Sequence, residues 1–224
     1  MRIYSIISLL MVCSVHIQAQ NCLLTYQDKY DQLLPLEMIK KHFWGDMSKA
    51  KKEYTVNKTP KYRNHDTYAY SWPSDRTRTM KLMGKEMTVP VSNRIGLTWV
   101  GDDMFKMSKN KSDLENFRFF YRNLTQKELD EAFGKAEKQV ENKTNATKEQ
   151  KAAGMGIAKD MAAATKFENV AGVGEAAVWK LGDNELIVLF KGYTFQVIAD
   201  VSKDKATNLE LAKKLAAEVV AKCK

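Results

Sequence analysis

The sequence predicts an α+β protein in which a central antiparallel sheet has helices packed on both faces, an α/β/α sandwich. Three observations near the C-terminus predict it. Within Glu185–Lys191 the five inner residues, Leu186–Phe190, are all apolar, so a strand there is buried on both faces. Lys191-Gly192 can turn this strand into Thr194–Val201, where apolar and polar residues alternate. An amphipathic helix follows from Thr207, and because one helix covers only one face, a second layer must come from earlier in the chain.

The C-terminal segment reads as a three-stranded antiparallel meander followed by a helix. Ala176–Leu181 is the first strand, and Gly182-Asp183-Asn184 is a loop of turn-forming residues. Thr207 and Glu210 have the spacing of a capping box that opens the helix. The apolar stripe of this helix is Leu209, Ala212, Leu215, Ala216, Val219 and Cys223.

The N-terminus is typical of a secretory signal peptide over residues 1–19. Arg2 is the positive region, Ile3–Ile17 is the apolar run, and cleavage is expected after Ala19. The alternative, a short membrane anchor, is disfavoured because the run is short and no positive stop follows it. Residues 20–224 are then one domain, exported to the periplasm or secreted, with no transmembrane segment in the mature chain.

Two cysteines remain after the signal peptide, Cys22 and Cys223, and they lie near the two ends of the mature chain. In an oxidising compartment, a disulfide bond between them is predicted. The alternative is two free thiols. A lipidated Cys22 is disfavoured because Ala19-Gln20-Asn21 lacks the residues that lipoprotein processing prefers.

The first half of the chain predicts a helix and a strand before a hairpin. Leu36–Trp44 is a helix that ends at Gly45. Ser48–Asn64 has no steady period and is expected to be a long exposed loop. Asp66–Trp72 alternates as a strand does, with three aromatic side chains on one face: Tyr68, Tyr70 and Trp72.

Further strands are expected before the middle helices. Arg76–Met83 and Glu86–Val91 form a hairpin across Gly84-Lys85, and Arg94–Val100 is the next strand. Phe117–Tyr121 is expected to be a short aromatic strand.

Two helical segments follow. A capping box at Thr125 and Glu128 opens the first, whose apolar stripe is Leu129, Phe133, Ala136 and Val140. Asn142–Thr147 breaks it, and the Ala-rich Lys148–Thr165 is expected to be helical despite two glycines. Residues 142–165 therefore form a helical insertion.

A family resemblance rests on three segments: Leu33–Phe43, the aromatic strand Asp66–Trp72, and Gly172–Trp179 before the final hairpin and helix. In this order they resemble the PsbP-like exported sandwich proteins, including the LpqN-type lipoproteins of mycobacteria. The resemblance implies a central antiparallel sheet with helices on both faces and a binding or accessory role. It offers no catalytic residues. The chain differs from that family in lacking a lipobox and in carrying the helical insertion.

Motifs for cofactors and metals have simpler interpretations. Gly172-x-Gly174-x-x-Ala177 matches the dinucleotide fingerprint, but it precedes a strand instead of opening a helix. His42 and His65 lack identifiable carboxylate partners for a metal site. Asp102-Asp103 can offer oxygen ligands to a hard cation but fits a turn better, because the spacing of a calcium loop is absent. No cofactor and no metal are therefore expected.

Methionines and glycosylation motifs are the remaining features of note. Five central methionines can fill gaps in the core, which is favoured, or line a groove for a soft or apolar ligand: Met80, Met83, Met87, Met104 and Met107. The acceptor sequons begin at Asn123, Asn142 and Asn145 and matter only in a eukaryotic host.

Positive charge is concentrated in one segment. The formal net charge is +9, and Lys40–Lys81 holds eleven basic and four acidic residues, an excess of seven. Tyrosines alternate with these cations, a composition that suits phosphate, sulfate or carboxylate groups on lipids or glycans. The alternative is a solvated basic loop. The candidate ligand-binding residues are Lys51, Lys52, Lys58, Lys61, Arg63, Arg76 and Arg78.

The predicted function is an exported, non-enzymatic binding or accessory protein of the cell envelope. Its partner is expected to be an anionic envelope lipid or polysaccharide, or a protein; nucleic acid is not expected, because exported proteins rarely meet it. One alternative is a subunit of an envelope complex that docks through methionines and aromatic residues. The other is a hydrolase with carboxylates such as Asp66 and Asp102, although no catalytic motif for a serine or cysteine nucleophile occurs.

Overall fold

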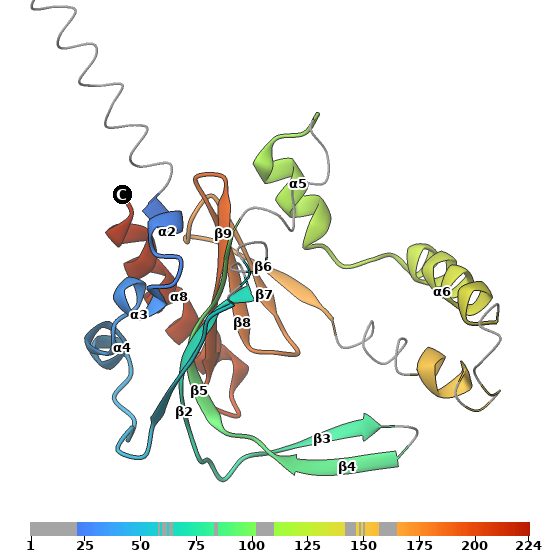
Figure 1. Ribbon diagram of the computed structural model, residues 1–224, viewed down its shortest axis with the longest axis horizontal. Coiled ribbons are helices and arrows are strands. Elements are labelled where there is room, and N and C mark those ends of the chain that lie inside the picture. The colour runs from blue at the N-terminus through green and yellow to red at the C-terminus, as the bar shows by residue number, and fades with distance from the viewer. Residues whose placement is uncertain are drawn as a thin grey trace, which may run out of the picture.

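The computed structural model has an α+β architecture (Figure 1). It describes residues 22–57, 59, 62, 65–82, 85–101, 110–141, 147, 149, 151–156 and 165–224. The expected signal peptide, residues 1–19, lies outside the described residues.

Seven strands form one antiparallel sheet in the order β1-β2-β5-β9-β8-β7-β6. The strands are β1 (Lys51–Thr55), β2 (Thr67–Trp72), β5 (Asn93–Gly101), β6 (Phe167–Val170), β7 (Ala176–Lys180), β8 (Glu185–Phe190) and β9 (Tyr193–Asp200). The meander β7-β8-β9 is the predicted one. Pairing of β9 with β5 joins it to the N-terminal half of the chain.

Strand β8 is buried on both faces, as predicted. The buried apolar side chains form two clusters, a larger one that we call the main core and a smaller second cluster. Leu186 and Val188 belong to the main core, and Ile187 and Leu189 belong to the second cluster. All four side chains are at most 2% exposed. The expected turn is also confirmed: Lys191 and Gly192 both have positive φ, 50° and 78°, as in a two-residue hairpin turn of type I′.

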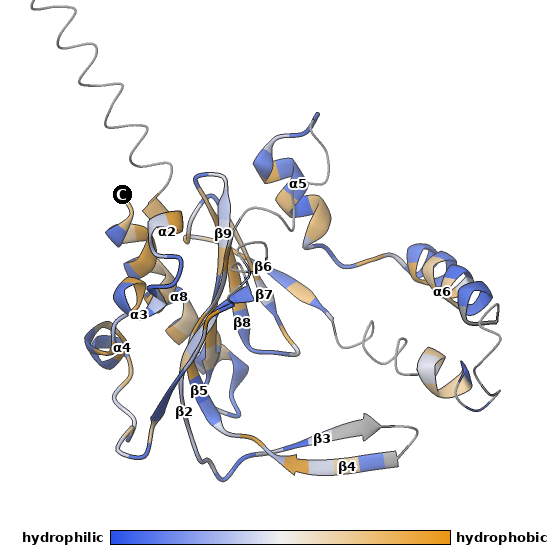
Figure 2. Cartoon of the chain, in the orientation of Figure 1, coloured by the Kyte–Doolittle hydropathy of each residue, from blue (hydrophilic) through white to orange (hydrophobic). Residues whose placement is uncertain are grey.

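Four helices contribute buried side chains to the main core: α2 (Cys22–Thr25), α3 (Tyr30–Leu33), α4 (Leu36–His42) and α8 (Lys205–Lys222). They lie side by side against one face of the sheet (Figure 1). In Figure 2, hydrophobic colour collects on the strands and on the parts of α8 beside them, whereas α4 is mostly hydrophilic in colour. The inward stripe of α8 is as expected: five of the six named residues are buried, and Leu209 is half-buried.

The start of α8 corrects one prediction. The helix begins at Lys205 with Asp204 as its cap, and Thr207 is already helical. The Asp204 carboxylate accepts hydrogen bonds from the backbone N–H groups of Ala206 (3.0 Å) and Thr207 (3.2 Å). An ionised carboxylate at this position also interacts favourably with the helix dipole, so Asp204 is the better cap.

The expected strand at Phe117–Tyr121 is wrong, because this segment lies in helix α5 (Asp113–Phe120) and at its C-cap. Ser112 and Glu115 form a capping box that starts the helix. Helical spacing of four residues puts Phe117 and Tyr121 on one face, where they join the second cluster with Ile187 and Leu189.

The expected exposed loop at Ser48–Asn64 is wrong in part, because β1 lies within it. Tyr54 explains the strand. Its ring packs against Tyr68 (5.5 Å between centroids), and its hydroxyl accepts a hydrogen bond from the Tyr30 backbone N–H (2.8 Å). Burying this aromatic group favours pairing of β1 with β2 despite the charged neighbours.

The predicted hairpin is present as β3 (Thr77–Leu82) and β4 (Lys85–Pro90), a separate two-stranded sheet that projects from one end of the seven-stranded sheet (Figure 1). Met87 on this hairpin is 47% exposed, so it does not fill the core as expected. Met83, Met104 and Met107 lie outside the described residues.

Helix α6 (Gln126–Glu141) begins at the predicted capping box. The Glu128 side chain accepts a hydrogen bond from the Thr125 N–H (2.9 Å), and the Thr125 hydroxyl accepts one from the Glu128 N–H (3.3 Å). The helix extends away from the sheet (Figure 1). Of the helical insertion, residues 151–156 are helical, and most of the rest lies outside the described residues. No described helix combines the length and the apolar character needed to cross a membrane.

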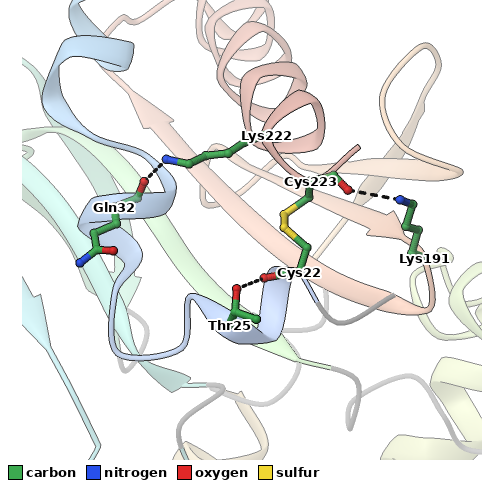
Figure 3. The surroundings of a disulfide bond; sticks show 6 residues. All are labelled: Cys22, Thr25, Gln32, Lys191, Lys222 and Cys223. Atoms are coloured by element: carbon green, nitrogen blue, oxygen red, sulfur yellow. Dashed lines mark hydrogen bonds between the residues drawn. A yellow bond between two sulfur atoms is a disulfide. The ribbon is translucent and has the colours of Figure 1, made fainter. Parts of the chain in front are cut away.

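The predicted disulfide bond is present (Figure 3). Cys22 on α2 and Cys223 at the end of α8 are joined with 5.5 Å between their Cα atoms, across 201 residues of sequence. Lysine side chains flank the bond: Lys191 Nζ donates to the Cys223 carbonyl (3.2 Å), and Lys222 Nζ donates to the Gln32 carbonyl. The bond therefore holds α2 on α8.

Removing the disulfide bond should destabilise the fold. The double variant Cys22→Ser, Cys223→Ser should lose about 2–5 kcal/mol of unfolding free energy, because a long loop in the unfolded chain is no longer closed. Urea unfolding checks this, and reduced wild-type protein is the control that should match the variant. Equal stability of the oxidised wild type and the variant would contradict it.

Candidate anion-binding cleft

Charged residues gather at one end of the sheet, where β9 ends and β5 and β8 begin. Register places Arg94 opposite Asp200 and Glu185 opposite Ile198 at this end. The strand β3 of the projecting hairpin also starts here, because Arg76 just before it reaches Asp200. This is called the Asp200 end of the sheet.

Arg76 and Asp200 form a buried ion pair, with the two residues each 8% exposed. Arg76 Nη1 donates to Asp200 Oδ1 and to the Ser202 carbonyl (3.2 Å). Arg76 Nη2 donates to the carbonyls of Asp200 (2.7 Å) and Ser92 (3.2 Å). One guanidinium thus joins the base of the hairpin, the end of β9 and the loop before α8.

Asparagines complete this frame. Asn184 Nδ2, from the turn before β8, donates to Asp200 Oδ1 (3.0 Å). Asn208 on α8 is fully buried; its Oδ1 accepts from the N–H groups of Val201 (3.1 Å) and Ser202 (2.9 Å). The hydrogen bonds to Val201 and Ser202 fix the segment that leads into Lys203 and Lys205.

A cleft of about 400 Å³ lies at this end, with Arg76 and Asp200 among its lining residues. Three cations surround it: Arg78 on β3, and Lys203 and Lys205 at the start of α8. We call these three residues the cationic rim. Arg78 is only 3.9 Å from Asp200 Oδ2, with 45% of its side chain exposed. Among the described residues, no carboxylate lies within ion-pair distance of either lysine, so the rim has spare positive charge.

A second cleft of about 420 Å³ adjoins the first and shares Arg78 and Asp200. Its remaining charges are mixed, because Arg94 faces Asp183 and Glu185 there. Burial raises the pKa of the Glu185 carboxyl above 4.5, although Lys180 and Arg94 act to lower it. This cleft is therefore less suited to an anion than the first.

The seven predicted ligand-binding residues have different positions. Arg76 is buried and engaged within the fold, and Arg78 belongs to the cationic rim. Lys51 and Lys52 lie exposed on the edge strand β1, and Lys52 is 3.4 Å from Asp31. The other three lie outside the described residues: Lys58, Lys61 and Arg63.

Sequence reasoning missed Lys203 and Lys205. They stand among ordinary charged residues on either side of the helix cap Asp204, and only the tertiary structure shows that both line the cleft. Their partner Arg78 is about 125 residues earlier in the chain, so no local pattern connects them.

The histidines have packing partners. His42 Nε2 is 2.7 Å from Glu218 Oε1, and the His65 ring packs edge-on against Trp99 at 4.4 Å. The described residues contain no group of three side chains that could hold a metal ion. Asp102-Asp103 lies outside them.

A further cleft of about 460 Å³ lies between α5 and strands β6 and β7. Two arginines line it: Arg118, which is exposed, and Arg122, which is paired with Glu128 (2.8 Å). The lining also includes the carboxylate residue Glu175. The Asn123 side chain both donates to the Phe167 carbonyl (3.0 Å) and accepts from its N–H (2.9 Å), so this sequon amide is engaged in the fold. Asn142 and Asn145 lie outside the described residues.

Comparison with known proteins identifies no relative: the chain matches no family model, no curated protein and no solved structure.

Loss of Arg76 should be far more costly than loss of Arg78. Arg76→Met leaves the buried Asp200 carboxylate without its main partner and should cost about 3–5 kcal/mol of unfolding free energy. The matched control Arg78→Met removes an exposed cation and should cost less than about 1 kcal/mol. Urea unfolding distinguishes the two. Similar losses for both variants would show that the Arg76–Asp200 pair is not the structural base of the cleft.

The raised pKa of Glu185 predicts a pH dependence of stability. The folded state holds this proton more tightly than the unfolded chain, so the contribution of Glu185 is complete below about pH 4.5 and is lost as pH rises through the folded pKa. Wild type should therefore become less stable relative to Glu185→Gln between about pH 4 and about pH 8. Unfolding curves at both pH values measure this, and a constant difference would contradict it.

Proposed function

We propose that the protein is an exported, non-enzymatic binding or accessory protein of the cell envelope. It binds the anionic group of an envelope lipid or acidic polysaccharide at the cleft bounded by the cationic rim. The observation that carries this proposal is the convergence of Arg78, Lys203 and Lys205 around one cleft.

The electrostatics favour a phosphate, sulfate or carboxylate ligand. The Asp200 carboxylate is already neutralised by Arg76, so the three rim cations are left to attract an anion. Their long, exposed side chains can adapt to headgroups of different shape. Arg78 can in addition bind an oxyanion through two N–H groups, which fixes its orientation.

Export is supported by two features of the chain. Residues 1–19 have the pattern of a signal peptide, and the disulfide bond between Cys22 and Cys223 fits an oxidising compartment.

For the fold, we propose a three-layer α/β/α sandwich of the PsbP-like kind. Packing of Phe117 and Tyr121 from α5 against Ile187 and Leu189 supports a second helical layer.

A second candidate is a subunit of an envelope complex. It is favoured by exposed apolar side chains, since Met87 on the projecting hairpin is 47% exposed and Phe119 on α5 is 50% exposed. The hydrolase alternative gains no support: the Asp66 carboxylate accepts from the Asn57 backbone N–H (2.6 Å) and side-chain amide (3.0 Å), and Asp102 lies outside the described residues.

Neutralising the cationic rim should remove anion binding. Arg78→Gln, Lys203→Gln, Lys205→Gln should weaken binding by about 100-fold, because each cation near an anionic surface contributes about 1 kcal/mol. The matched control, Lys127→Gln, Lys135→Gln, Lys138→Gln on α6, removes the same charge and should bind within about twofold of wild type.

Binding is measured at low and physiological salt with three probes: phosphatidylglycerol vesicles, soluble glycerol phosphate and polygalacturonate. The lipid probes and the polysaccharide separate the two ligand sources. Equal binding by the rim variant and the α6 control would overturn the proposal.

A further inference from the structure

One tryptophan differs from the other three. Trp72, Trp99 and Trp179 are 7%, 8% and 1% exposed, whereas Trp44 is 88% exposed. The indole ring is a large apolar surface with one polar N–H group, so leaving it in water forgoes a substantial hydrophobic gain. Among the described residues, Trp44 has the highest exposure of the large hydrophobic side chains.

Packing places Trp44 near the cationic rim. Its neighbour Phe43 packs on Trp72 with 5.6 Å between ring centroids. Phe43 also lines a cleft with Val201, Asp204 and Ala206, the segment in which Lys203 and Lys205 lie. The backbone that carries Trp44 therefore borders the Asp200 end of the sheet.

Cations surround this tryptophan in the chain. Lys40 and Lys41 occupy the last turn of α4 just before it, and Lys49 follows in the loop to β1. All three are exposed, although Lys41 also pairs with Glu218 (2.5 Å). The single acidic residue between Trp44 and Lys49 is Asp46.

We propose that Trp44 is the interfacial anchor with which the Asp200 end of the molecule docks on an anionic lipid bilayer. A tryptophan ring is favoured at the boundary between headgroups and acyl chains, where the ring is apolar and the N–H stays wet. Lysines beside it attract anionic headgroups. Stable peripheral binding needs two such signals, and this end of the molecule provides both.

This inference rests on the proposed function and deepens it, because it chooses the lipid surface over the polysaccharide. Charge complementarity favours an anionic bilayer as the binding partner of Trp44. Exposed lysines flank the ring in sequence, and the cationic rim lies at the same end of the sheet. A protein surface or a second copy of the chain would instead be expected to cover the ring without requiring anionic lipid.

Intrinsic fluorescence tests the anchor directly, since Trp44 is the one exposed tryptophan of the four. Vesicles of phosphatidylglycerol and phosphatidylcholine should shift wild-type emission to shorter wavelength, protect it from acrylamide and allow quenching by brominated acyl chains. Vesicles of phosphatidylcholine alone should not. The Trp44→Phe variant keeps the three buried tryptophans and should show none of these changes.

Partitioning measures the energetic role. Trp44→Ala should bind phosphatidylglycerol vesicles about tenfold more weakly, since the ring's partial burial contributes on the order of 1.4 kcal/mol. The matched control Phe119→Ala, which removes a half-exposed ring on α5, should bind as wild type does. Trp44→Ala should still bind soluble glycerol phosphate, because the rim is unchanged.

The outcomes separate this inference from the proposed function. Vesicle binding without an emission shift, or unchanged binding by Trp44→Ala, overturns the anchor and leaves the rim proposal standing. An emission shift that depends on protein concentration without lipid overturns the anchor in favour of a second copy. Conversely, loss of vesicle binding in Trp44→Ala with full binding by the rim variant supports the anchor and overturns the rim.

Discussion

The buried pair of Arg76 and Asp200 is the interaction on which the candidate site depends. Its hydrogen bonds reach the hairpin base, the end of β9 and the loop before α8. The end of β9 and the loop before α8 are neighbours in the chain, but Arg76 lies 124 residues before Asp200, and nothing local would hold the hairpin base against them. A buried charge without its partner is unfavourable, so the pair strongly constrains where the chain can lie. The positions of Arg78, Lys203 and Lys205 follow from that constraint.

The same residue type has two roles within three positions of the chain. Arg76 is enclosed and its N–H groups are used by the protein, whereas Arg78 points its guanidinium toward a cleft and is half exposed. Because Arg76 already neutralises Asp200, the outer cations are left with spare charge. A structural ion pair thus leaves the neighbouring cations free to bind a ligand. The disulfide bond between Cys22 and Cys223 separately stabilises the layer of helices on one face of the sheet, because it joins α2 to α8.

Local sequence patterns predicted most helices, strands and turns correctly. They did not predict which charged side chains from distant parts of the chain lie together. The doubly apolar β8, its turn at Lys191-Gly192 and the pairing of Cys22 with Cys223 each follow from neighbouring residues or from a count of two cysteines. The aromatic run at Phe117 has the composition of a strand, but the capping box of Ser112 and Glu115 starts a helix there, and this local signal outweighs β-propensity. Arg76 was indistinguishable from its exposed neighbours, because burial depends on Asp200, 124 residues away.

The most direct measurement is a crystal structure of the protein with glycerol phosphate, a soluble form of the proposed anionic group. Density for the phosphate is expected in the cleft, within hydrogen-bond distance of Arg78 and at least one of Lys203 and Lys205, with Arg76 still bound to Asp200. Phosphate bound elsewhere with this cleft unchanged, or Arg76 released from Asp200 to hold the ligand, would contradict it.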